Sequence, residues 1–262
     1  MTGPALDSQG VTLGYGKRTI SSNLSAHIPA GSFTAVIGPN ASGKSTLLRA
    51  LARLIAPSAG SVLLDGRDLT TFTTKELARN LGLLPQTSIA PDGIRVADLV
   101  GRGRYPHQGA FDRWSVRDEE AVAAAMDATG VTDLSGRLVD ELSGGQRQRV
   151  WVAMVLAQQT NVLLLDEPTT FLDIAHQLAA LELFQDLNRD HGHTLVAVLH
   201  DLNQAARYAT HIIAMADGTI IASGAPADVI TVEIIESVFD IRCRVIDDPE
   251  SGTPMVIPLA RS

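Results

Sequence analysis

The sequence predicts an α/β fold with a mainly parallel sheet, and three observations lead to that class. Short apolar runs alternate with segments of helical periodicity, which is typical of strands linked by helices. A glycine-rich turn joins a short run of mainly apolar and β-branched residues, 33–37, to a helical segment. Two hairpin patterns add an antiparallel part. In such sheets ligands bind beyond the carboxyl ends of the strands, so functional residues are expected there.

Composition limits what this protein does. The 262 residues carry a net charge of −8, which disfavours nonspecific binding to nucleic acid; Arg102, Arg104, Arg113 and Arg117 come nearest to a basic patch. Cys243 is the only cysteine, so neither an intrachain disulfide nor a cysteine-rich metal site is expected. We expect no secretory signal and no membrane-spanning helix, because no apolar run approaches 18 residues.

The elements of the first half follow from apolar runs, turn residues and helix caps. In order, we expect a hairpin of residues 11–16 and 24–28, a strand at 33–37, a helix from about 43, a strand at 61–66, a capped helix at 73–80, a strand at 81–84, a short helix at 96–100 and a capped helix at 115–129.

The turn after residue 37 fits the phosphate-binding pattern G-x-x-x-x-G-K-[ST]. Its residues are Gly38, Pro39, Asn40, Ala41, Ser42, Gly43, Lys44, Ser45 and Thr46. Small residues turn backbone N–H groups onto phosphate oxygens, and the helix adds its positive N-terminal end. Lys44 then neutralises β- and γ-phosphate charge, and the Ser45 hydroxyl ligates Mg²⁺. The alternative is a glycine-rich turn without a ligand.

The second half alternates in the same way. We expect a helix from Ser143 to about 158, a strand at 162–167, a helix at 173–189, a strand at 194–199, a helix from Asp201 to 208, a hairpin of 212–216 and 219–223, and a tail of one or two helices with one last short strand. Gly144 and Gly145 expose the first N–H groups of the helix after Ser143, which makes a second potential anion site.

Four polar residues follow strands of the predicted sheet. Asp166 is placed to hold Mg²⁺, and Glu167 to activate a water for attack on a γ-phosphate. His200 and Gln86 also fall just past strand ends. Each alone has a plain structural alternative: an acidic pair that caps a helix, a strand-end histidine, a solvated glutamine. Their conjunction with the phosphate loop favours nucleotide hydrolysis.

The candidate motifs come in this order along the chain: the phosphate loop, Gln86, residues 142–146 (LSGGQ), residues 162–167, Asp173 and His200. Together they resemble the motifs of the ATP-binding-cassette (ABC) ATPases, and the resemblance covers roughly residues 6–235. The LSGGQ signature is the most specific, because other phosphate-loop enzymes lack it. Ala41, where the family often has Gly, and Phe171, where a smaller residue is common, are mild departures. The resemblance implies a RecA-like P-loop NTPase core at 1–86 and 158–262, an antiparallel β subdomain and an inserted α-helical subdomain at about 87–157, all in one domain of residues 1–262.

The resemblance also implies a site shared by two copies. Head-to-tail dimers of this family hold ATP and Mg²⁺ between one phosphate loop and the other copy's signature turn, which is Ser143, Gly144, Gly145 and Gln146 in this sequence. Tyr15 is expected to stack on adenine, Lys44 and His200 to contact the γ-phosphate, and Asp173 to touch the opposing copy. Gln86 is expected to join Ser45 and Asp166 near the metal and to sense the γ-phosphate.

Residues 101–107 (GRGRYPH) and 198–205 (VLHDLNQA) resemble the importer group for iron–siderophores, haem and cobalamin. This implies a peripheral subunit on the cytoplasmic face of the cell membrane. Its partners would be integral membrane permease subunits and, indirectly, a substrate-binding protein, with no nucleic acid. Ferric siderophore is the expected cargo, with haem and cobalamin as alternatives. A soluble ABC ATPase of DNA repair or iron–sulfur assembly, and a nucleotide-gated module without hydrolysis, are alternative classes.

Overall fold

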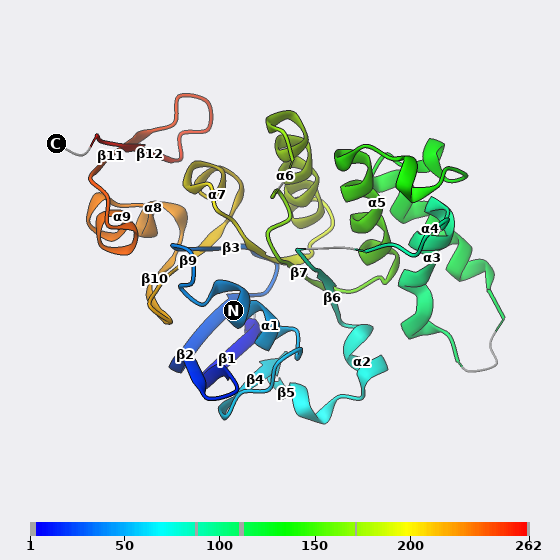
Figure 1. Cartoon of the computed structure of the whole chain (residues 1–262), viewed down its shortest axis with the longest axis horizontal. Coiled ribbons are helices and arrows are strands. Elements are labelled where there is room, and N and C mark those ends of the chain that lie inside the picture. The colour runs from blue at the N-terminus through cyan, green and yellow to red at the C-terminus, as the bar shows by residue number, and fades with distance from the viewer. Residues whose placement is uncertain (1–3, 87–88, 110–112, 171, 261–262) are drawn as a thin grey trace. The chain divides into compact units, whose positions relative to one another are not determined.

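A computed structural model describes residues 4–86, 89–109, 113–170 and 172–260. The chain forms two compact units, Met1–Thr71 with Gln185–Ser262, and Phe72–Phe184. Both units combine strands and helices (Figure 1). The predicted limits of the helical subdomain, about 87–157, stay a prediction, and residues 87 and 171 lie outside the described residues.

An antiparallel sheet opens the first unit. Its strands are β1 (Pro4–Tyr15), β2 (Arg18–Pro29), β4 (Ala59–Leu64) and β5 (Arg67–Asp68), in the order β2-β1-β4-β5. β1 is the centre, since Leu6 pairs with Ile28 on one side and Leu64 on the other. The C-terminal half of β2 alternates buried and exposed residues, as expected of a sheet with one covered face. The predicted antiparallel part is confirmed, with longer strands than expected.

Parallel strands make the centre of the first unit. β3 (Phe33–Ile37) pairs in parallel with β8 (Thr194–Val198) and β9 (His211–Ala216), and β10 (Thr219–Gly224) pairs antiparallel with β9. Every residue of β3 and β8 is buried, as their apolar runs predict. Helices α1 (Lys44–Leu51) and α7 (Leu202–Tyr208) follow β3 and β8 after short turns. The parallel arrangement brings the ends of β3 and β8 to one edge.

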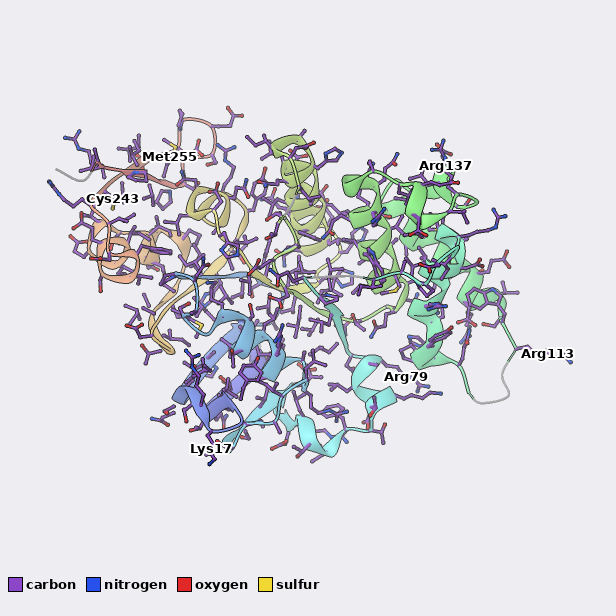
Figure 2. All side chains as sticks on the ribbon, in the orientation of Figure 1. Lys17, Arg79, Arg113, Arg137, Cys243 and Met255 are labelled. Atoms are coloured by element: carbon purple, nitrogen blue, oxygen red, sulfur yellow. The ribbon has the colours of Figure 1, made fainter. Side chains whose placement is uncertain are left out.

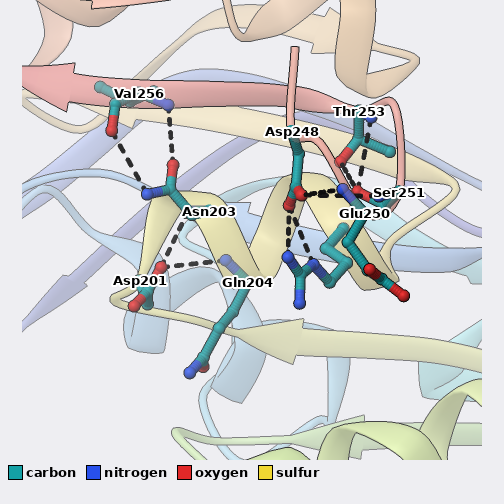
Figure 3. Close-up of polar contacts among 9 residues, drawn as sticks. Asp201, Asn203, Gln204, Asp248, Glu250, Ser251, Thr253 and Val256 are labelled. Carbon is teal, nitrogen blue, oxygen red and sulfur yellow. Dashed lines mark hydrogen bonds and ion pairs between the residues drawn. The ribbon is translucent and has the colours of Figure 1, made fainter. Parts of the chain in front are cut away.

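The tail holds α8 (Pro226–Val229), α9 (Val232–Phe239) and a hairpin of β11 (Cys243–Asp247) and β12 (Pro254–Pro258). We expected one last strand in the tail, and the structure has two. The hairpin is held to α7 by hydrogen bonds across the fold (Figure 3): Val256 N donates to Asn203 Oδ1 at 2.8 Å, and Arg207 donates to Asp248 Oδ2. The turn residues Glu250 and Ser251 donate backbone N–H groups to Asp248 Oδ1.

The second unit contains one parallel strand pair and most of the helices. β6 (Leu81–Leu84) pairs with β7 (Val162–Leu165). The helices are α2 (Thr74–Ala78), α3 (Val96–Gly101), α4 (Val116–Ala128), α5 (Gly144–Ala157) and α6 (Ile174–Arg189), which continues into the first unit. α5 packs against both α3 and α4 (Figure 1). Short 3₁₀ segments are Leu69–Thr71 in the first unit, and Arg102–His107, Thr132–Leu134 and Val139–Glu141 in the second.

Arg104 does not belong to a surface patch. Its side chain is buried and pairs with buried Asp118 at 2.9 Å, and it also donates to Ala157 O at 2.7 Å and to Gln159 Oε1 at 2.8 Å. Hydrogen bonds from Ser115, together with Arg104, hold the pKa of the Asp118 carboxyl below its usual value despite burial. Arg113 is exposed at the edge of the unit (Figure 2). Arg104 therefore ties the 3₁₀ turn to α4 and α5.

Candidate functional site

The phosphate loop lies between β3 and α1, as predicted, and its backbone explains its glycines. Gly38 has φ 151° and Gly43 has φ 100°, conformations that side chains rarely adopt. A Cβ at Gly38 would lie 2.8 Å from Ser42 Oγ and would overlap the carbonyl of Met215. Ala41 also has a positive φ, 64°. Gly218 N donates to Ser42 O at 3.1 Å and fastens the loop to the β9–β10 turn.

Lys44 folds back over this loop. Its side chain is buried, and Nζ donates to Gly38 O and Pro39 O at 2.8 Å each. The buried hydroxyl of Ser42 has no hydrogen-bond partner among the described residues. A buried cation, an orphaned hydroxyl and the N-terminal N–H groups of the eight-residue α1 are the donor set that phosphate oxygens need. The loop therefore fits a nucleotide phosphate.

His200 and Tyr15 belong to the same unit as the loop. Val36 of β3 lies opposite Val198 of β8, and Leu199 N donates to Val36 O at 3.2 Å. His200 follows directly and is exposed at the edge where the phosphate loop begins. Tyr15 ends β1 with 44% of its surface exposed, and its hydroxyl accepts from Arg49 Nη1 at 3.3 Å. The exposed ring is available to a ligand.

In the second unit, Gln86, Asp166 and Glu167 meet beyond β6 and β7. Leu84 pairs with Leu165, and Asp166 N donates to Leu84 O at 2.9 Å. Asp166 is buried, whereas Gln86 is exposed and donates from Nε2 to Glu167 Oε2 at 2.6 Å. Thr170 Oγ1 donates to the same oxygen at 3.1 Å. Glu167 has φ 52°, a strained backbone of the kind that gathers at functional sites.

The signature residues form the start of α5. Ser143 Oγ accepts from Gln146 N at 3.3 Å, and Gln146 Oε1 accepts from Ser143 N at 3.1 Å. This capping box leaves Gly144 and Gly145 in the first turn of the helix. Asp173 lies directly before α6, and its Oδ1 accepts from His176 N at 3.0 Å and from His176 Nδ1 at 2.7 Å.

The predicted site residues thus fall into two groups, one in each unit. The first unit brings together the phosphate loop and His200, and the second brings Gln86 to Asp166 and Glu167. That the two groups form one site stays a prediction. Sequence reasoning missed Thr170, which has no motif signal, and His176, whose signal is its spacing of three residues from Asp173.

The part of the chain that the structure describes holds no group of three or more His, Cys, Asp or Glu side chains that could bind a metal ion. None of the described helices is long and apolar enough to cross a membrane.

Comparisons with known proteins agree on one family. The family model described as "ABC transporter" matches residues 21–170, more than half of the chain. The ferric enterobactin transport ATP-binding protein of Escherichia coli K12 is 58% identical over 98% of this chain and 95% of its own length. A probable siderophore transport system ATP-binding protein of Bacillus subtilis 168 is 51% identical over 98% of this chain and 94% of its own length.

Solved structures give the same result for the fold. A putative metal-chelate type ABC transporter in an inward-facing conformation matches with a TM-score of 0.85 and 28% identity, over 99% of this chain and 98% of that one. A bacterial ABC transporter cassette, solved as a dimer, matches with a TM-score of 0.73 and 26% identity, over 84% of this chain and 98% of that one. The predicted P-loop NTPase fold is confirmed. Because the family model spans most of the chain and relatives above 50% identity span nearly all of it, the chain belongs to the ABC transporter family.

Proposed function

We propose that this chain is the ATP-hydrolysing subunit of a membrane importer for ferric siderophores. The observation that supports this most is its 58% identity, over nearly the full length of both chains, to an ATP-binding protein of ferric enterobactin transport. The intact phosphate loop, Glu167 and His200 favour a hydrolysing subunit over a module that only binds nucleotide.

ATP binds first to the phosphate loop of the first unit. Backbone N–H groups of the phosphate loop surround the phosphate oxygens, and Lys44 exchanges its carbonyl partners for β- and γ-phosphate oxygens. Tyr15 stacks on the adenine, because its exposed ring lies at the end of β1. Ser45, Asp166 and Gln86 would hold Mg²⁺, which would neutralise phosphate charge.

Hydrolysis then depends on Glu167. Its carboxylate accepts a proton from the attacking water, and the hydrogen bonds from Gln86 and Thr170 to Oε2 fix its orientation. His200 donates to the γ-phosphate and stabilises the charge that develops there. Because Gln86 bonds directly to Glu167, a movement of Gln86 reorients the base.

A second copy completes the site. The signature turn of one copy closes on the nucleotide held by the other, with the α5 N-terminus directed at the γ-phosphate, and Asp173 touches the opposing copy. The dimer sits on the cytoplasmic face of the membrane, bound to integral permease subunits, which connect it indirectly to a substrate-binding protein. We expect no nucleic-acid partner.

The proposal is tested by reconstituting the chain with its permease and binding protein in vesicles. We expect ATP-dependent uptake of ferric siderophore, and no comparable uptake of haem or cobalamin.

Lys44→Ala should abolish ATP binding or hydrolysis. Glu167→Gln should keep ATP binding and nearly stop hydrolysis, because general-base catalysis contributes roughly 10²–10⁴-fold. If the vesicles take up only haem or only cobalamin, that compound replaces ferric siderophore as the assigned cargo. If the chain co-purifies only with DNA-repair or cluster-assembly proteins, the assignment as an importer subunit is overturned.

A further inference from the structure

His176, in the first turn of α6, lies against the signature turn of the same copy. A Cβ placed on Gly145 would be 2.6 Å from both Cγ and Nε2 of the His176 ring and would overlap the ring edge. Real Cβ atoms essentially never approach other atoms so closely. The imidazole therefore fills the space that any other residue at position 145 would need.

Asp173 holds this ring in place. Its Oδ1 accepts from both the backbone N–H and Nδ1 of His176, at 3.0 and 2.7 Å. These two bonds keep the pKa of the Asp173 carboxyl below its usual value, and the bond from the backbone N–H contributes more than the bond from the imidazole. One carboxylate oxygen thus fixes both the helix start and the ring against rotation.

A second contact ties the same two segments. Gln148, three residues after Gly145 on α5, donates from Nε2 to Pro168 O at 2.8 Å. Pro168 follows Glu167, and Thr170 bonds to Glu167. The segment that carries Glu167 and Asp173 is thus tied to α5 at two places, one of them the His176 ring. A shift of that segment must move the signature turn or break these contacts.

We propose that His176 is a positioning residue, which sets the signature turn at Gly145 against Asp173 and occupies the space that a Cβ at position 145 would need. The inference rests on the proposed function, in which that turn closes on the partner's ATP. Together with the bond of Gln148 to Pro168, His176 ties the turn to the segment that carries Glu167 and Asp173, so that closure of the dimer and placement of the base change together.

A double-mutant cycle tests the contact without nucleotide. Gly145→Ala should lower the melting temperature by about 2–10 °C, because overpacking strains the interior. His176→Ala should remove most of that loss when combined with it, so that the two effects are not additive. If Gly145→Ala lowers the melting temperature equally with His176 present and with His176 replaced by Ala, the assigned contact is overturned. His191→Ala, at an exposed histidine beyond α6, is the matched control and should not change the effect of Gly145→Ala.

ATP-driven dimerisation tests the positioning role. In otherwise wild-type protein, His176→Ala should lower kcat on the order of 10-fold to 100-fold, since misplacement by about 1 Å costs that much. ATP binding should be unchanged. In the Glu167→Gln background, light scattering should show that His176→Ala weakens the ATP dimer. His176→Asn, which keeps a donor for Asp173, should recover part of both losses.

The outcomes separate this inference from the proposed function. If the Glu167→Gln parent forms no dimer with ATP while the melting temperatures still couple, the shared-site function fails and the contact stands. If that parent dimerises, and His176→Ala changes neither its dimerisation nor the kcat of the otherwise wild-type protein, the positioning role is overturned. Equal kcat for His176→Asn and His176→Ala would likewise exclude the bond to Asp173 as its basis.

Discussion

Ala41 adopts a left-handed backbone conformation in the phosphate loop, with φ 64°. The left-handed conformation costs a non-glycine residue roughly 1–2 kcal/mol relative to glycine. Glycine keeps only part of that advantage, because it loses more conformational entropy when the chain folds. We predict that Ala41→Gly raises the free energy of unfolding by up to about 1 kcal/mol. Urea unfolding measures this change. Gly31→Ala is the reverse control, because Gly31 has φ 69° and open space around its Cβ position, and it should be destabilising.

At this scale the sequence predicts chemistry better than conformation. The phosphate loop, Asp166, Glu167 and His200 could be placed because each must follow a strand, and strands show as apolar runs. The positive φ values of Ala41 and Glu167 had no signal, since no glycine marks either position. The bond between Gln86 and Glu167 joins residues 81 positions apart, so only the pairing of β6 with β7 reveals it.

The ion pair of Arg104 with Asp118 joins a 3₁₀ turn to α4. Both side chains are buried, so removing one partner leaves the other charge without compensation. We predict that Arg104→Ala lowers the free energy of unfolding by about 3–5 kcal/mol. Arg113→Ala removes the same side chain at an exposed position and should change it by less than about 0.5 kcal/mol. Similar losses in both variants, measured by urea unfolding, would contradict the assigned role of Arg104.

The tail hairpin makes stability depend on pH through Asp248. The side-chain bond from Arg207, and then the backbone N–H of Glu250, lower the pKa of the Asp248 carboxyl from 3.8 to about 2. Because the pKa is lower in the folded chain, this stabilisation is complete above pH 3.8 and is lost as pH falls toward about 2. We predict that Asp248→Asn destabilises the protein near pH 7 and that its difference from wild type shrinks below pH 4. Asp247→Asn, at the exposed neighbour, is the control.

Local elements were predictable where one short pattern specifies them. Capped helices at 73–80 and 115–129 were expected, and the structure has capping boxes of Thr73 with Glu76 and of Ser115 with Asp118. At Ser143 the helix start was expected, whereas the capping box with Gln146 was not. The second tail strand was missed, and the hydrogen bonds that hold it to Asn203 connect residues 53 positions apart. Such contacts leave no periodic trace in a short strand.

At the scale of the whole molecule, each compact unit holds one part of the predicted machinery. The first has the cation that a nucleotide needs, and the second has the base and the signature turn. Motif order identified these residues, whereas their division between the two units comes from the structure. How two copies combine depends on surfaces rather than motifs, and therefore needs an experiment on assembly.

Ser143→Arg tests that assembly. The change leaves Lys44, Ser45 and Asp166 intact, so each copy should still bind ATP, but a bulky cation at the α5 N-terminus blocks closure over the partner's nucleotide. Hydrolysis should fall to background. In the Glu167→Gln background, ATP should drive dimerisation in gel filtration, and adding Ser143→Arg should abolish it. Thr132→Arg, which places the same charge at an exposed position of the same unit, should leave the dimer intact. A Ser143→Arg variant that still dimerises with ATP, or a wild-type enzyme whose specific activity is independent of protein concentration, would refute a site shared by two copies.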